Sequence, residues 1–260
     1  MREEEVEFEN KGDKIVGLLS SPDLGSSNLV ILAHGFAANM NIELYKKLAP
    51  RLVENGFASY RFNYRFISDG YENFHKMTFD GEVDDLKLVI GKFSKRYKNI
   101  GVVGESLGGA VSILSYSSRV KCLVLFYPAI FFKNDIRREW SSEEKIRELN
   151  EKGYFSFVKK STGQILHVGK KFTEGINSID DILQEIPKIK CPIMFIHGDS
   201  DRTVSYTESE RAFKVANKPK RIEIIKGAEH GFKDDNYMPS EELQDKAIAL
   251  TIEWFKEWLK

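Results

Sequence analysis

A serine stands between two glycines at residues 104–108, in the pattern Gly-x-Ser-x-Gly. The apolar run Ile100–Val103 precedes this pattern, and a helix-like run follows it from Leu107. A serine at such a strand-to-helix turn can lie on a sharp, strained bend, where flanking glycines let the backbone approach closely. The pattern predicts that Ser106 is a nucleophile, although a glycine-rich turn in an unrelated sheet has a similar sequence.

A serine hydroxyl needs a general base to take its proton and an acidic group to orient that base. Of the five histidines, His230 is placed best, because it follows the last predicted strand at the edge where Ser106 lies. For the acid, the loop after residues 191–198 offers Asp199 and Asp201. We favour Asp201, which lies further from the strand and can turn toward the neighbouring loop. The predicted catalytic residues are Ser106, Asp201 and His230.

The other four histidines favour other roles. His34 and His197 each precede a glycine at a strand end, which favours a structural role or a role in oxyanion-loop geometry. His75 and His167 have no recognisable carboxylate near them in the sequence, so we expect surface positions.

A tetrahedral intermediate needs two hydrogen-bond donors for its oxyanion. One predicted donor is the backbone N–H of Leu107, the residue after the nucleophile. The other comes from the loop His34–Ala37, where we favour the N–H of Phe36. The ring of Phe36 can also line an acyl pocket, and we expect Phe36, Trp140 and Phe232 to contact the substrate.

The order of apolar and helical segments predicts the fold that positions these residues. An N-terminal pair, Glu4–Glu9 and Lys14–Ser20, flanks a turn signal and predicts a hairpin. Further runs are almost continuously apolar, as in parallel strands covered on both faces, and they lie at 28–35, 57–64, 99–106, 120–129, 191–199 and 220–229. Helical patterns alternate with them at 43–55, 81–96, 107–118, 206–217 and 240–260. This alternation predicts an α/β protein with a mostly parallel, doubly wound sheet and an N-terminal antiparallel hairpin.

Residues 131–186 interrupt this alternation and are far too many for a simple connection. They contain a charged helical stretch at Ser141–Lys152, an alternating stretch at 154–172 that predicts a hairpin around Ser161, and a short helical pattern at Ile179–Glu185. We interpret them as a cap over the carboxyl edge of the sheet, inserted into a core formed by residues 1–130 and 187–260. Six aromatic residues predict that the cap shapes a substrate pocket: Phe131, Phe132, Trp140, Tyr154, Phe155 and Phe157.

The segments LAHGF, GESLGG, HGDSD and GAEHGF, with an insert after the sixth strand, together resemble the α/β-hydrolase serine esterases. The chain order Ser106, Asp201, His230 is the order found in that fold. Residues 61–86 are similar to the cinnamoyl and feruloyl esterase branch in their RFNY core, their SDG turn and the acidic helix that follows. The resemblance implies ester hydrolysis without a metal or organic cofactor, and a cap that shapes the acyl or alcohol site.

The composition is that of an ordinary globular protein and gives no reason to expect nucleic acid or an anionic membrane. Its 39 Lys and Arg residues balance its 39 Asp and Glu residues. No apolar run approaches the ~18 residues of a membrane span, and the N-terminus is acidic, so we expect a cytoplasmic protein. Cys122 and Cys191 are too few and too far apart for a zinc or redox site. The expected partner is a small-molecule ester, with no nucleic acid and no membrane, and a homodimer is compatible with the sequence.

The leading hypothesis is a serine carboxylesterase that hydrolyses small or aromatic, cinnamoyl-type esters through an acyl-enzyme intermediate. A monoacylglycerol lipase or an acyl-peptidase is the alternative within the same fold, because fold alone does not determine the substrate. A noncatalytic binding protein of the same fold is the alternative of another class. The complete set of three candidate catalytic residues argues against it.

Overall fold

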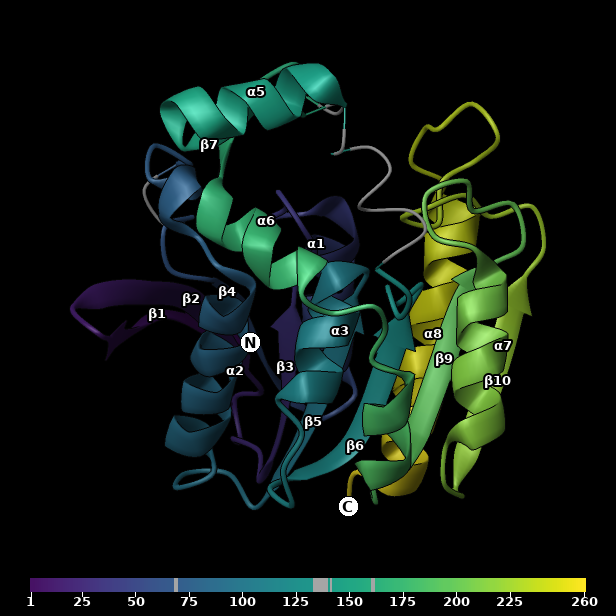
Figure 1. Ribbon diagram of the computed structural model, residues 1–260. Coiled ribbons are helices and arrows are strands. Elements are labelled where there is room, and N and C mark those ends of the chain that lie inside the picture. Colours follow the sequence, from purple (N-terminus) through teal and green to yellow (C-terminus); the bar gives the residue numbers. More distant parts are fainter. Residues whose placement is uncertain (68–69, 133–139, 141, 160–161) are drawn as a thin grey trace.

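Eight strands form one sheet at the centre of the molecule (Figure 1). The structure is a computed structural model, and it describes residues 1–67, 70–132, 140, 142–159 and 162–260. In spatial order the strands are β1 (Arg2–Asn10), β2 (Asp13–Ser21), β4 (Ala58–Asn63), β3 (Asn28–Ala33), β5 (Asn99–Glu105), β6 (Val120–Phe126), β9 (Ile193–Gly198) and β10 (Lys220–Ile225). β2 runs antiparallel to β1 and β4, and all other neighbours are parallel. The predicted mostly parallel sheet with an N-terminal hairpin is confirmed.

Helices cover both faces of the sheet, as the strand and helix alternation predicts (Figure 1). One face carries α2 (Phe79–Phe93), α3 (Leu107–Leu114) and α7 (Tyr206–Val215), with the short 3₁₀ helix η1 (Phe74–Lys76) before α2. The other face carries α1 (Glu43–Glu54) and α8 (Glu241–Trp258). Each of these α-helices overlaps a predicted one, and their ends differ from the predicted ends by a few residues.

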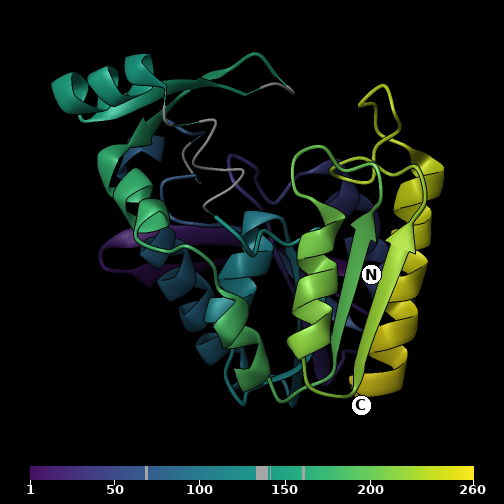
Figure 2. The same ribbon diagram turned by 45° about the vertical axis from the view of Figure 1, so that its right-hand side comes forward.

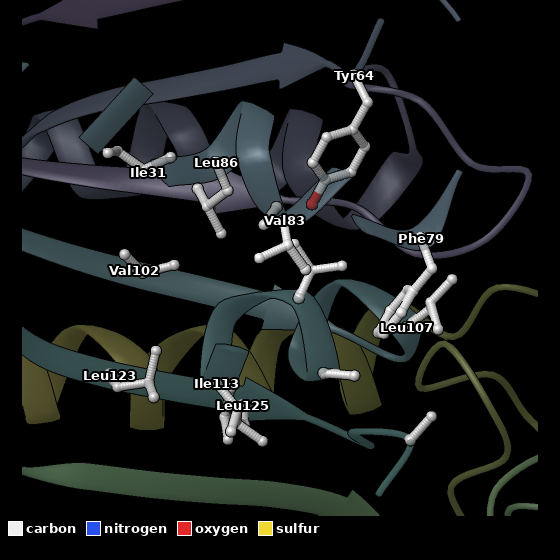
Figure 3. Packing of buried hydrophobic residues seen from close by; sticks show 14 of the residues in the cluster. Ile31, Tyr64, Phe79, Val83, Leu86, Val102, Leu107, Ile113, Leu123 and Leu125 are labelled. Carbon is white, nitrogen blue, oxygen red and sulfur yellow. The ribbon is translucent and has the colours of Figure 1, made fainter. Parts of the chain in front are cut away.

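The strands direct their side chains alternately into two hydrophobic layers. In β3, Leu29 and Ile31 pack into the layer of α2 and α3, whereas Val30 and Leu32 pack into the layer of α1 and α8. All four side chains are fully buried. Figure 3 shows the first layer, with Ile31, Val102 and Leu123 from the sheet near Val83, Leu86 and Ile113 from the helices. Burial on both faces is the reason that these strands are apolar along their whole length.

The described part of residues 131–186 forms an insertion between β6 and β9. It contains α5 (Glu143–Lys152), the antiparallel pair β7 (Tyr154–Val158) and β8 (Ile165–Gly169), and α6 (Lys170–Asn177), and the 3₁₀ helix η2 (Leu183–Lys188) begins in it and ends two residues beyond it. In Figure 2, the arrowheads of β9 and β10 point toward the end of the molecule where α5 and β7 lie. The hairpin and α5 therefore lie beyond the carboxyl ends of the parallel strands.

Two details of this insertion differ from the sequence prediction. Lys170–Asn177 forms a helix, because Phe172, Thr173 and Ile176 place one buried stripe at helical spacing. The helix predicted at Ile179–Glu185 is instead a 3₁₀ helix that begins at Leu183, where the Asp181 side chain accepts the Leu183 N–H at 3.0 Å. The expected helix start at Ser141 and the turn residue Ser161 lie outside the described residues.

Candidate active site

Ser106 occupies a strained turn between β5 and α3. Its backbone has φ 52° and ψ −120°, in the region of positive φ that residues with a side chain rarely adopt. Neighbouring glycines allow this turn to pack tightly. A Cβ at Gly104 would lie 2.4 Å from Ser112 Oγ, and a Cβ at Gly108 would lie 2.3 Å from the Ala33 carbonyl oxygen. The Gly-x-Ser-x-Gly pattern therefore has a steric cause, and its geometry is that of a nucleophile elbow.

His230 and Asp201 lie in direct contact on neighbouring loops. His230 Nδ1 is 2.8 Å from Asp201 Oδ2, while Asp201 Oδ1 accepts the backbone N–H groups of Thr203 and Val204, each at 2.8 Å. Burial alone would raise the pKa of Asp201, but hydrogen bonds from His197 and His230 outweigh it and hold that pKa below its usual value. An ionised, fully buried carboxylate thus fixes the orientation of the His230 ring.

Asp199, the alternative acid, makes different contacts. Its Oδ1 accepts the Gly227 N–H at 2.6 Å and the Ser200 hydroxyl at 3.1 Å, at the exposed end of β9. These bonds tie the loop after β9 to the turn after β10. The structure brings Asp201, and not Asp199, to His230.

A tight loop after β10 presents the His230 ring. Glu229 and Lys233 exchange backbone hydrogen bonds of 2.9 and 3.3 Å, and Gly231 and Phe232 between them have positive φ. The His230 ring also packs against the Tyr127 ring, with ring centroids 4.5 Å apart. Asp201 and Tyr127 both contact the imidazole, and the His230 side chain remains 18% exposed toward a pocket that Ser106 also lines.

The loop His34–Ala37 lies against Ser106. A Cβ on Gly35 would be only 3.1 Å from Ser106 Cβ, so the two backbones approach closely here. None of the backbone hydrogen bonds among the described loops uses the N–H of Phe36 or of Leu107. Both predicted oxyanion donors therefore have uncommitted N–H groups beside Ser106.

A pocket of about 570 Å³ opens at Ser106 and His230. Phe36 and Trp140 line it as predicted contacts, with ring centroids 5.0 Å apart. Phe232 does not: it is fully buried and packs against Phe126 and Tyr127 beneath the His230 loop. The expectation that Phe232 contacts the substrate is wrong, because its positive φ helps turn the chain so that the ring enters the core. Of the six aromatic residues that the sequence assigns to the pocket, Trp140 and Phe157 line it, and the other four do not.

The sequence prediction missed three residues that line this pocket, which are Lys159 after β7, Glu105 and Tyr127. Glu105 is only 8% exposed, and a carboxylate is costly to bury at the end of an apolar strand unless it is paired. A glutamate at the end of an apolar strand is visible in the sequence, and this feature could have indicated that Glu105 belongs to the site.

The remaining histidines lie where the sequence predicts supporting or surface roles. His34 is buried, which lowers its pKa to about 4, and its Nδ1 contacts the Gly35 carbonyl oxygen at 2.9 Å. His197 is fully buried beneath the loop that carries Asp201, with Nε2 at 3.0 Å from the Val204 carbonyl oxygen. His75 and His167 are exposed.

Features of some other protein classes are absent from the ranges that the structure describes. No helix in them combines the length and the apolar character needed to span a bilayer. No group of three or more His, Cys, Asp or Glu side chains there could hold a metal ion. Cys122 and Cys191 are free and buried, and burial raises the pKa of Cys191 to about 12.

A Gly-x-Ser-x-Gly turn after β5, an aspartate after β9 and a histidine after β10 on this sheet match the arrangement of the α/β-hydrolase fold. Solved structures have the same fold: a putative hydrolase from Agrobacterium vitis S4 (TM-score 0.79, 16% identity, 97% of this chain and 98% of that one) and Est1E from Butyrivibrio proteoclasticus with bound ferulic acid (TM-score 0.77, 20% identity, 96% and 99%). Protein usf from Aquifex pyrophilus is 23% identical over 98% of each chain. Residues 30–259 match the dienelactone hydrolase family, and the chain belongs to that family. It is a hydrolase of the α/β type.

Proposed function

We propose that the protein is a serine carboxylesterase that hydrolyses small or aromatic carboxylic esters through an acyl-enzyme intermediate. The observation that carries the proposal is the strained Ser106 turn in one pocket with a His230 ring held by Asp201 at 2.8 Å. A serine, a base and an orienting acid are the groups that nucleophilic acyl transfer requires.

In the proposed reaction, His230 Nε2 accepts the Ser106 proton as the Ser106 oxygen attacks the ester carbonyl. The carbonyl oxygen becomes an oxyanion and accepts the N–H groups of Phe36 and Leu107. His230 then donates the proton to the leaving alcohol, and the acyl group stays on Ser106. Water repeats these steps in the second half, with His230 as its base, and releases the acid.

The pocket walls support an aromatic or short acyl group. Phe36, Trp140 and Phe157 contribute aromatic rings, and the Phe36 ring lies 5.4 Å from the Phe157 ring. Apolar walls with few polar groups are typical of small-molecule sites. The structural similarity to Est1E, which was solved with ferulic acid, makes hydroxycinnamoyl esters the first aromatic substrates to test.

The test is a panel of esters assayed with the unchanged protein and with Ser106→Ala. The panel contains p-nitrophenyl esters of increasing chain length, methyl ferulate, a monoacylglycerol and an aminoacyl amide. We expect turnover of methyl ferulate and of short p-nitrophenyl esters, and none by Ser106→Ala, because the turn offers no other nucleophile. Preference for the monoacylglycerol or the amide would instead indicate a lipase or an acyl-peptidase. Turnover of none of these compounds would contradict the proposal.

A further inference from the structure

We propose that Glu105 is a positioning residue of this site, which holds the oxyanion loop against the nucleophile and the Tyr127 ring against His230. The proposal rests on the proposed function, because it concerns how the same site is organised. Glu105 is the last residue of β5 and directly precedes Ser106. Its two carboxylate oxygens reach two different parts of the site, which neither the chain order nor the family membership assigns to it.

The first oxygen fixes the oxyanion loop. The Gly35 N–H donates to Glu105 Oε1 at 2.7 Å, in a buried setting. A hydrogen bond to a charged acceptor is stronger and more directional than one between neutral groups. Because Gly35 and Phe36 are consecutive, this bond sets the orientation of the peptide plane that precedes the Phe36 donor. The loop is thereby fixed relative to Ser106 before a substrate arrives.

The second oxygen fixes the support of the base. The Tyr127 hydroxyl donates to Glu105 Oε2 at 2.8 Å, and the Tyr127 ring packs on His230 with centroids 4.5 Å apart. Tyr127 is 1% exposed, and its φ of 35° shows that the chain bends sharply there. Burial raises the pKa of Tyr127 well above its usual value, and the Glu105 charge raises it further, so this hydroxyl remains a donor.

The negative charge of Glu105 lies on the same pocket wall as the base. Its charge also acts on Tyr45 on α1, Tyr64 after β4 and Lys233 after β10. Each of its oxygens accepts a hydrogen bond, one from the Gly35 N–H and one from the Tyr127 hydroxyl, so its proposed role is to orient these two groups.

The chain contains a matched control carboxylate. Glu208 on α7 is also buried, and its Oε2 accepts the N–H groups of Ile130 and Phe131 at 2.7 and 3.0 Å. It does not line the pocket that Ser106 and His230 share. A substitution of Glu208 therefore reports the cost of losing a buried structural carboxylate alone.

The experiment compares kcat and KM for p-nitrophenyl acetate, with urea unfolding of each variant. We expect Glu105→Gln to lower kcat by about 10- to 100-fold with KM within about threefold, and Glu105→Ala to lower kcat further. Glu208→Gln should lower the urea midpoint of unfolding and leave kcat within about twofold.

Tyr127→Phe tests the second link on its own and keeps the proposal open to refutation where a Glu105 variant does not fold. It keeps the Glu105 carboxylate and removes the hydroxyl, so we expect a severalfold loss of kcat with KM little changed. A kcat within twofold of the unchanged protein would overturn the link through Tyr127. A folded Glu105→Gln protein with unchanged kcat would overturn the proposal as a whole. Labelling of Ser106 by a fluorophosphonate in the unchanged protein tests the proposed function separately.

Discussion

The substitution Asp201→Asn tests the proposed acid of the site with little change in the shape of the side chain. In the structure, Oδ1 accepts two backbone N–H groups, from Thr203 and Val204. These groups can only donate, so the asparagine oxygen must stay with them. The new NH₂ group then faces His230 Nδ1, which is 2.8 Å from the present Oδ2. Because the asparagine NH₂ group can only donate, Nδ1 of His230 must be the acceptor, and the ring takes the tautomer with its proton on Nε2.

In that tautomer, His230 cannot accept the Ser106 proton. The equivalent substitution in a serine protease lowers kcat by about 10⁴-fold for this reason. We expect a loss of kcat of about 10³- to 10⁴-fold here, which corresponds to about 4 to 5.5 kcal/mol of transition-state stabilisation. Substrate binding does not use the acid, so KM should change little.

The assay is steady-state hydrolysis of p-nitrophenyl acetate, with circular dichroism and urea unfolding of each variant. Asp199→Asn is the matched control, since Asp199 bonds to Gly227 and Ser200 rather than to the base. A greater loss of kcat in Asp199→Asn than in Asp201→Asn would refute this reasoning about the acid loop.

Two buried carboxylates and one aromatic ring of the pocket can each be tested by substitution. The folded-state pKa of Asp201 is held below its unfolded value near 3.9, so the stabilisation that this carboxylate gives is present above about pH 4 and declines as the pH falls further. In urea unfolding between pH 2 and 6, the free energy of unfolding should therefore fall less steeply with decreasing pH in Asp201→Asn than in the unchanged protein. Burial, and then the charge of Asp85, raise the pKa of Glu82, so the contribution of Glu82 to stability falls as the pH rises through that raised pKa. The free energy of unfolding of Glu82→Gln, compared with that of the unchanged protein, should therefore be more favourable at pH 8 than at pH 5. Phe157 lines the pocket, whereas Tyr154 on the same strand packs against the exposed His167 ring. Phe157→Ala should therefore reduce the preference for methyl ferulate over p-nitrophenyl acetate, measured as the ratio of kcat/KM values, by about 10-fold or more. An equal change of that ratio in Tyr154→Ala would contradict the assignment of Phe157 to the substrate pocket.

The parts of the fold that the sequence predicted are those with a local physical cause. Continuous apolar runs correspond to strands because both faces of the sheet are buried, as Ile31 and Leu32 illustrate. The turn at Ser106 was recognisable because Gly104 and Gly108 leave no room for a Cβ. The pairing of Asp201 with His230 was predictable in outline, since parallel strands carry their following loops to one edge.

The missed parts depend on contacts between distant segments. Phe232 is in the same local sequence as His230, and only the tertiary turn directs its ring into the core. Glu105 gains its partners from Gly35 and Tyr127, which follow two different strands. In the insertion, the helix at Lys170–Asn177 directly follows β8, so the local alternation concealed where the strand ends.

The central claim is that Ser106 is the nucleophile of this hydrolase, and one measurement tests it most directly. The unchanged protein is incubated with a fluorophosphonate, its intact mass is measured, and the modified peptide is sequenced by tandem mass spectrometry. We predict one adduct per chain, located on Ser106, with parallel loss of ester hydrolysis and no adduct in Ser106→Ala. An adduct on another residue, or full esterase activity in the Ser106→Ala protein, would contradict the account.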